Sequence, residues 1–279
     1  MGFMSTLKAT KAAKKQRAGE KEEAFRLYEE AFAEGENQAR FVLSYALLMI
    51  RDGQYQKAKD FLVKHQKAPG MTPEQRVNLL VDYAACCFRL GDLEKGISTL
   101  EQQARKGETG LVYQTLGYLY VEKYDAANRP DFSQLPAEAE EKPAEETEAP
   151  ELPAEGEEAE KKLSPEEAWE AGLKAAEEFI DKSIEYDEED AVCLDNKAQF
   201  LYRVHGDKQG ARKWFEKALS IKDNQIDTLY FLSRYDEEDG DRQAALEKLE
   251  KAAAGRFSPL NYCSKETIEK EIARLKGAN

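Results

Sequence analysis

The chain has 279 residues, of which 34% are charged and 41% hydrophobic, and its formal net charge is -14. A chain of this length is expected to form one or two domains. Its mean hydropathy of -0.73 is low for a compact sphere. Phosphate backbones repel an acidic chain, so general nucleic-acid binding is not expected. No stretch approaches the roughly 18 uninterrupted apolar residues that a membrane-spanning helix needs.

The N-terminal residues 1–17 carry several basic side chains, but no apolar run follows them. This pattern gives no sign of a secretory signal, and we expect a cytoplasmic protein. The four cysteines are Cys86, Cys87, Cys193 and Cys263, and none forms a C-x-x-C pair. They therefore predict neither a zinc site nor a redox site, and we expect small buried thiols.

A short pattern recurs along the chain, in which a glycine is followed five positions later by an alanine or a second glycine. A glycine can end a first helix in a left-handed conformation at little cost. The small residue then lets a second helix pack closely against the first. The successive second members lie 34 residues apart at both ends of the chain. The five copies are Gly19 with Ala24, Gly53 with Ala58, Gly91 with Gly96, Gly206 with Ala211, and Gly240 with Ala245.

A spacing of 34 residues is the period of the tetratricopeptide repeat. Tyr113, Leu116, Gly117 and Tyr120 also match that family's aromatic-x2-Leu-Gly-x2-Tyr signature. The chain therefore resembles a tetratricopeptide repeat protein. The resemblance implies an all-α, right-handed superhelical solenoid of about six helix–turn–helix repeats, closed by a C-terminal capping helix over about residues 264–276.

Several residues depart from the family pattern. Lys8 and Lys11 stand where the first helix of the first repeat should be apolar, and Asp195 replaces the first aromatic residue of the fifth repeat. His65 and Gln103 replace small residues in two second helices. We expect these residues to change local packing without changing the architecture.

The fourth repeat is interrupted by an acidic segment. Residues 128–163 are rich in Pro, Glu and Ala, and residues 137–162 contain eleven Glu but only three Lys. Such a segment buries too little apolar surface to offset the entropy of ordering it, which predicts a disordered insert. The next helix is expected to begin at Ser164-Pro165-Glu166-Glu167, which has the form of a capping box.

The acidic insert has two possible roles. It is either a solubilising loop, or an arm that docks on something basic or folds back on the chain's own groove. The sequence predicts four segments. Residues 1–127 contain repeats one to three and the first helix of the fourth repeat, and residues 128–163 form the insert. Residues 164–256 contain the second helix of the fourth repeat and repeats five and six, and residues 257–279 form the capping helix.

In the family that the chain resembles, first helices line a concave groove in which ligands usually lie. Aromatic and aliphatic residues interleave there with Arg and Asn, a mixture that suits a peptide or helix of a partner protein. The residues expected to face this groove are Arg40, Leu43, Leu47, Asn78, Phe88, Gln114, Tyr118, Asn196, Phe200, Arg203, Tyr230 and Arg234.

The resemblance implies a non-enzymatic scaffold or adaptor with a protein or peptide partner, present as a monomer or weak homo-oligomer. The alternative is a structural protein that acts through homo-oligomerisation. Ala9 and Ala13 occupy positions where chaperone-tail binders carry clamp residues, so that ligand is not predicted. His65 and His205 are the only histidines and have no nucleophile placed beside them. We therefore predict no catalytic, cofactor-binding or metal-binding residue, and no nucleic-acid or membrane partner.

Overall fold

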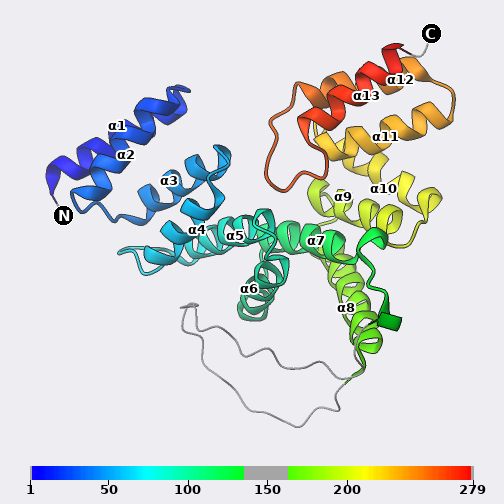
Figure 1. The fold of residues 1–279 in the computed structure, drawn as a ribbon, viewed down its shortest axis with the longest axis horizontal. Helices are drawn as coiled ribbons and strands as arrows, with labels where there is room; N and C mark the ends of the chain where they lie inside the picture. Colours follow the sequence, from blue (N-terminus) through cyan, green and yellow to red (C-terminus); the bar gives the residue numbers. More distant parts are fainter. Residues whose placement is uncertain (1, 135–162, 278–279) are drawn as a thin grey trace. The chain divides into compact units, whose positions relative to one another are not determined.

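The computed structural model describes residues 2–134 and 163–277 (Figure 1), and all regular structure within these residues is helical. The described residues form two compact units. The first unit comprises residues 2–107, and the second comprises residues 108–134 and 163–277. Each unit is described by itself.

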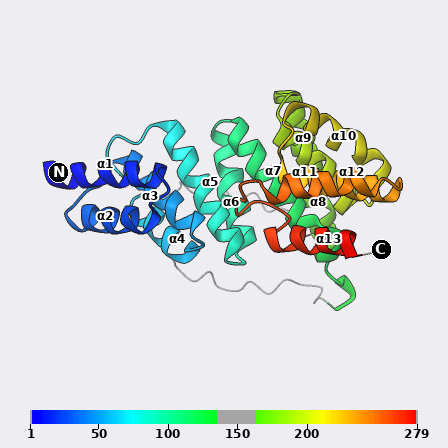
Figure 2. The ribbon, with the colours of Figure 1, turned by 90° about the horizontal axis from the view of Figure 1, so that it is seen from above.

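The first unit consists of antiparallel helix pairs that contact one another in chain order. Helices α1 and α2 lie side by side in Figure 2, α3 contacts both α1 and α5, and α4 contacts α5. Within residues 2–107 the pairs are α1 (Phe3–Arg17) with α2 (Lys21–Ala33), α3 (Ala39–Arg51) with α4 (Tyr55–Lys64), and α5 (Pro73–Arg89) with α6 (Leu93–Lys106).

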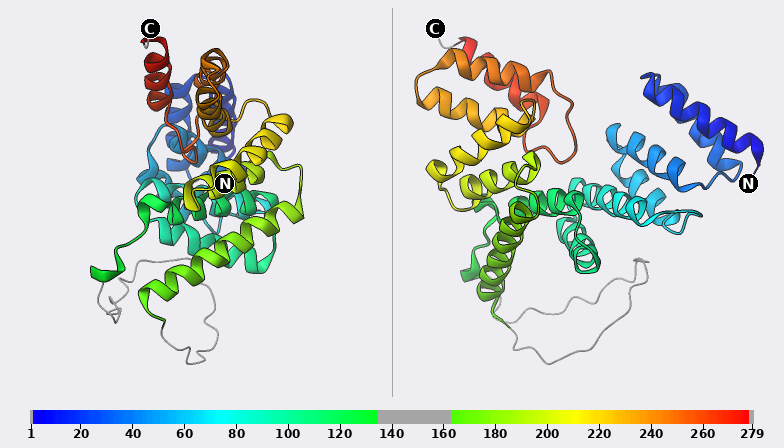
Figure 3. Two further views of the ribbon diagram at one scale, coloured as in Figure 1. Left: turned by 90° about the vertical axis from the view of Figure 1, so that its right-hand side faces the viewer. Right: turned by 180° about the vertical axis from the view of Figure 1, so that it is seen from behind.

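The second unit repeats this arrangement and adds a last helix, α13, which packs beside α12 (Figure 3). A single π-helical turn, Phe200–Val204, continues α9. The described helices of this unit are α7 (Gly110–Tyr124), α8 (Pro165–Tyr186), α9 (Ala191–Gln199), α10 (Lys208–Ile221), α11 (Ile226–Glu238), α12 (Arg242–Ala253) and α13 (Lys265–Gly277).

The glycine and the small residue of each copy of the sequence pattern take the predicted places. All five glycines have positive φ angles, from 69° at Gly206 to 85° at Gly240. The four alanines of the pattern are fully buried. In the remaining copy of the pattern the small residue is Gly96. A Cβ added there would lie only 3.1 Å from the carbonyl oxygen of Ala84 on α5, so the two helices are in close contact. The predicted helix boundaries and close helix contacts are therefore confirmed.

Helices α7 and α8 pack directly against each other although residues 125–164 separate them in the chain. The ring of Tyr113 lies 5.0 Å from that of Phe179, and the ring of Tyr124 lies 4.9 Å from that of Trp169. The predicted capping box also forms, because Ser164 Oγ accepts a hydrogen bond from the backbone N–H of Glu167. This pairing agrees with a fourth repeat whose two helices flank the insert.

Most of the predicted insert, residues 135–162, lies outside the described residues. Its beginning, which the sequence placed in a disordered segment starting at residue 128, is folded. The residues Ala126–Asn128 and Phe132–Gln134 form 3-10 turns. The rings of Phe132 and Trp169 are 6.2 Å apart, and Arg129 Nη2 lies 2.8 Å from Glu170 Oε1. These contacts hold the start of the segment against α8.

The residues that depart from the repeat pattern at the N-terminus have a local explanation. Helix α1 packs through the fully buried Ala9 and Ala12. Lys8 lies at the edge of this contact, where its ammonium is 3.0 Å from Glu30 Oε2 of α2 and also pairs with Glu34. A lysine is therefore accommodated because its charged end reaches solvent and two carboxylates.

The last helix covers the core of the second unit, as the sequence predicted. Ile268 and Leu275 of α13 are buried, and Ile272 packs partly buried against the same core cluster. The remaining faces of α13 are mostly charged and exposed. This is the amphipathic pattern of a helix that caps a repeat array.

Candidate protein-binding surfaces

The predicted groove residues of the first unit keep accessible surface. They come from α3 and α5, two first helices that pack against each other. Arg40 is exposed, with its guanidinium carbon 4.4 Å from the ring centroid of Phe41. Four further residues are only partly buried, namely Leu43, Leu47, Asn78 and Phe88. We call these five residues the α3–α5 face.

One carboxyl group beside the α3–α5 face has an altered proton affinity. Asp82 lies one helical turn after Asn78 on α5 and is partly buried. Burial raises the pKa of Asp82 to about 7, although the nearby positive charge of Arg51 opposes this shift. Perturbed groups of this kind are frequent at binding sites, but they also occur in purely structural settings.

Most of the groove residues predicted on α7, on α9 and on the π-helical turn after α9 are buried inside the second unit. Phe200 has no exposed surface, and Asn196 and Tyr118 are 2% and 5% exposed. Asn196 Nδ2 donates a hydrogen bond of 2.8 Å to the carbonyl oxygen of Gln114, whose own side chain donates to Asp190 Oδ2 at 2.7 Å. The helical period placed these residues on the correct face, but that face is packed against the neighbouring first helix. We therefore leave them out of the surface available to a partner.

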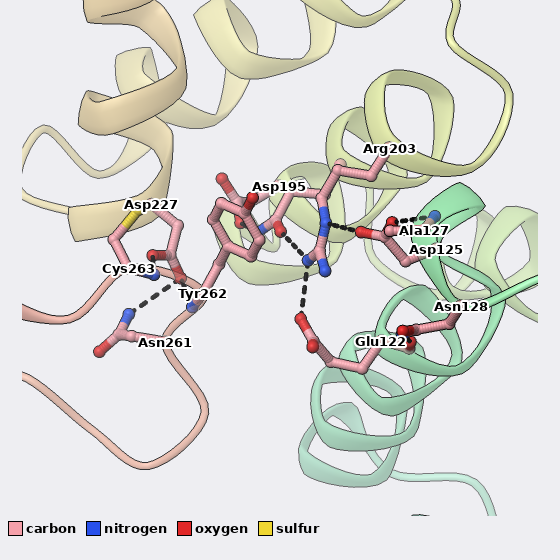
Figure 4. Close-up of polar contacts among 11 residues, drawn as sticks. Glu122, Asp125, Ala127, Asn128, Asp195, Arg203, Asp227, Asn261, Tyr262 and Cys263 are labelled. Carbon is pink, nitrogen blue, oxygen red and sulfur yellow. Dashed lines mark hydrogen bonds and ion pairs between the residues drawn. The ribbon is translucent and has the colours of Figure 1, made fainter. Parts of the chain in front are cut away.

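Arg203 is also internal. It is 9% exposed, and its guanidinium is held by three acceptors (Figure 4). Nε lies 2.8 Å from Asp125 Oδ2, and Nη1 lies 2.7 Å from Glu122 Oε1 and 2.9 Å from Gln199 Oε1. The arginine thus ties the end of α7 to the π-helical turn after α9, a structural task that sequence spacing did not reveal.

A loop between α12 and α13 crosses the first-helix face of α11. Asp227, in the first turn of α11, accepts hydrogen bonds from Asn261 Nδ2 at 3.0 Å and from the backbone N–H groups of Tyr262 at 3.0 Å and Cys263 at 3.1 Å (Figure 4). The ring of Tyr262 then stacks on that of Phe231, with centroids 5.3 Å apart. We call Asn261, Tyr262 and Cys263 the strap. Neither the strap nor Asp227 was among the predicted site residues.

Asp195, the departure from the aromatic pattern, takes part in this buried polar region. Its carboxylate accepts hydrogen bonds from Thr228 Oγ1 and from Gln199 Nε2, the latter at 2.7 Å. Burial and the neighbouring Asp227 carboxyl together raise the pKa of Asp195 to about 7, and burial also raises the pKa of Asp227. A polar residue replaces the aromatic ring here because Thr228 of α11 supplies a hydroxyl donor and Gln199 of α9, the helix of Asp195 itself, supplies an amide donor.

The accessible remainder of the predicted groove in the second unit is a small pocket of about 210 Å³ beside the strap. Tyr230 is buried, and its hydroxyl accepts a hydrogen bond of 2.7 Å from Nη1 of the exposed Arg234. Tyr262 of the strap is 43% exposed. The pocket is lined by Asp125, Tyr202, Arg203, Tyr230, Phe231, Arg234 and Tyr262.

The remaining sequence features are structural where they are described. His65 packs 4.4 Å from the ring of Phe61, and burial lowers its pKa. The four cysteines are buried and free. Across residues 2–134 and 163–277, no three His, Cys, Asp or Glu side chains are grouped so that they could hold a metal ion. None of the helices in these two segments has the length and apolar character needed to cross a membrane.

The paired helices, glycine turns and stacked order define an all-α helical-repeat protein. The family model of the anaphase-promoting complex, cyclosome, subunit 3, matches residues 19–103. No curated protein sequence matches the chain. Similarity to solved structures is confined to the fold, because identity is low, but it extends over most of the chain.

Three solved structures illustrate this similarity. The type IV pilus biogenesis factor PilW is 13% identical, with a TM-score of 0.58, over 98% of this chain and 100% of PilW. A tetratricopeptide repeat protein of Thermus thermophilus is 15% identical, with a TM-score of 0.55, over 85% of this chain and 98% of that one. The Cut9–Hcn1 hetero-tetramer of the anaphase-promoting complex gives 14% identity and a TM-score of 0.57, over 95% of this chain and 41% of the matched chain. The predicted resemblance is therefore confirmed, and the chain has the tetratricopeptide repeat fold.

Proposed function

We propose that the chain is a non-enzymatic scaffold that binds a peptide or helix of a partner protein on the α3–α5 face. The observation that carries this proposal is the difference between the two units. The first-helix residues of the second unit are largely buried by a neighbouring helix or lie beside the strap, whereas Leu43, Leu47 and Phe88 keep partly accessible apolar surface. Apolar anchors beside polar side chains are typical of the energetic centres of protein interfaces.

The fold supports an interaction role without naming the partner, since repeat folds host many functions. A solved structure of similar fold belongs to a hetero-tetramer of the anaphase-promoting complex. Arg40 at the edge of the face can pair with a carboxylate of a ligand, and Asn78 can donate to and accept from a peptide backbone. The ligand that fits best therefore combines an apolar anchor with an extended or helical backbone.

The test compares proteins captured by tagged forms of the full chain. A Leu43→Glu, Leu47→Glu, Phe88→Ala variant should lose a specific set of partners while retaining the helical circular dichroism of the wild type. The matched control is Leu111→Glu, Ile221→Glu, which changes exposed apolar residues outside the face. Capture of the same proteins by the triple variant would remove the support for this face.

A second candidate function is self-association, because one apolar stripe remains exposed at the N-terminus. Phe3, Met4 and Leu7 of α1 are 82%, 58% and 52% exposed. Sedimentation over a range of concentrations separates the two functions. A wild type that associates, together with a Phe3→Glu, Leu7→Glu variant that remains a monomer, would favour assembly through α1.

A further inference from the structure

A pocket lies in the first unit, on the side of α5 away from the α3–α5 face. Helix α4 ends at Lys64, whereas α6 continues to Lys106. The space beyond the end of α4 is a pocket of about 610 Å³. This volume is within the range of ligand-binding pockets. The pocket is lined by Val63, Gln66, Lys67, Arg76, Leu79, Leu80, Tyr83, Lys95, Ser98, Thr99, Gln102, Gln103 and Lys106.

The floor of this pocket is apolar. Leu80 and Val63 are partly buried, and Leu79 and Tyr83 are 5% and 6% exposed and belong to the core cluster between α4 and α5. Gln103, which stands where a second helix usually has a small residue, lines the wall with Gln66 and Gln102. Gln103, which departs from the repeat pattern, is therefore one of three amide side chains that can form hydrogen bonds beside the apolar floor.

The rim is basic in a chain whose net charge is -14. Within the part of the chain that the structure describes, the charged side chains that line the pocket are Lys67, Arg76, Lys95 and Lys106, and none is an Asp or a Glu. Among the described residues, the side-chain cations of Arg76, Lys95 and Lys106 form no ion pair. Other lysines of this unit, such as Lys8, Lys21 and Lys59, do pair with carboxylates. The three unpaired cations, together with the apolar floor, select a ligand with the opposite pattern.

We propose that this pocket binds an acidic segment of a partner protein that inserts one aliphatic or aromatic side chain between flanking carboxylates. The apolar side chain would rest on Leu79, Leu80 and Val63, and the carboxylates would pair with the rim. A peptide is favoured over a nucleic acid because Tyr83, the one aromatic residue among the described residues of the lining, is buried in the floor and offers no ring for base stacking. This site is separate from the α3–α5 face and does not depend on it.

The test uses purified full-length protein and a short labelled peptide with a central leucine flanked by glutamates, followed by fluorescence anisotropy. Reversing two rim charges replaces attraction of the probe's carboxylates by repulsion, so an Arg76→Glu, Lys106→Glu variant should bind about tenfold more weakly. Thr99→Phe, which fills the pocket without changing charge, should weaken binding by a similar factor. The control Lys14→Glu, Lys57→Glu makes the same charge change at exposed lysines outside the pocket and should retain the wild-type affinity.

Three results would overturn the proposal. The first is equal loss of affinity in the rim variant and the control, which would indicate attraction by net charge alone. The second is unchanged binding by Thr99→Phe in a variant whose circular dichroism is native. The third is tighter binding of a labelled single-stranded oligonucleotide than of the peptide. Replacing the central leucine of the probe by glycine should itself abolish the measured binding.

Discussion

The guanidinium carbon of Arg203 lies 4.0 Å from the ring centroid of Tyr262, although the two residues come from the π-helical turn after α9 and from the strap. The same guanidinium pairs with Glu122 and Asp125, and the strap is fixed by Asp227. One buried cation therefore connects α7, α9 and the segment before α13. The first-helix face of the second unit is therefore held by side-chain contacts between segments that are distant in the sequence.

Replacing Asp227 should loosen the strap. Asp227→Ala removes the acceptor for three hydrogen bonds, two of them from backbone N–H groups, and leaves these donors without that partner. We expect the free energy of unfolding of the second unit to fall by about 1–3 kcal/mol. The chain's two tryptophans, Trp169 and Trp214, both belong to this unit, so tryptophan fluorescence in urea reports on it selectively.

The control for this change is Asp223→Ala, which removes an exposed carboxylate paired with Lys251. Such a surface pair contributes at most about 1 kcal/mol. Asp227→Ala should also increase the reaction rate of Cys263 with a thiol reagent, because Cys263 is only 2% exposed while the strap is in place. Equal stability losses in both variants, with no change in thiol reactivity, would show that Asp227 does not hold the strap.

The stability of the second unit should depend on the ionisation of Asp195. Its pKa is about 7 in the folded chain, against an ordinary value of 3.8. A carboxyl whose pKa is higher in the folded than in the unfolded chain stabilises the fold while it is protonated. This stabilisation is fully present below the unfolded pKa and is lost as the pH rises through the folded pKa. Asp195→Asn resembles the neutral form at every pH. The stability of the wild type minus that of this variant should therefore fall by roughly 1–3 kcal/mol between pH 5 and pH 8.

Urea unfolding followed by tryptophan fluorescence at the two pH values measures this difference. Asp223→Asn is the matched control, because pairing with Lys251 lowers its folded pKa and both of its states are ionised over this range. It should show the same difference at both pH values. If the Asp195→Asn difference is constant or rises with pH, the carboxyl is already ionised inside the folded chain.

The sequence predicted the helices more reliably than the surface that they present. Gly240 and Ala245 mark a turn and a close contact through local conformation and size, which the chain carries residue by residue. The burial of Phe200, by contrast, depends on how one repeat stacks on the next. The two carboxylate partners of Arg203 lie 78 and 81 residues away, so no local pattern could show that this arginine is internal.

Arg203 should be costly to remove because its two carboxylate partners are themselves largely withdrawn from solvent. Glu122 and Asp125 side chains are 16% and 17% exposed, and each would lose its cation in an Arg203→Met variant. Breaking one side of a buried pair typically costs about 3–5 kcal/mol, since the remaining charge is left uncompensated. A double-mutant cycle with Glu122→Gln should recover part of this loss. Additive losses in urea unfolding would mean that the two side chains are not coupled.

A last prediction concerns the turn between α11 and α12. Gly240 has a φ of 85°, and a Cβ added there would meet no atom within 4 Å. The cost of Gly240→Ala should therefore come from the left-handed backbone alone, at about 1–2 kcal/mol. Gly240→Asn should cost less, because asparagine tolerates this conformation better than alanine does. Tryptophan fluorescence in urea gives both values, and an alanine variant as stable as the wild type would mean that the turn adopts another conformation.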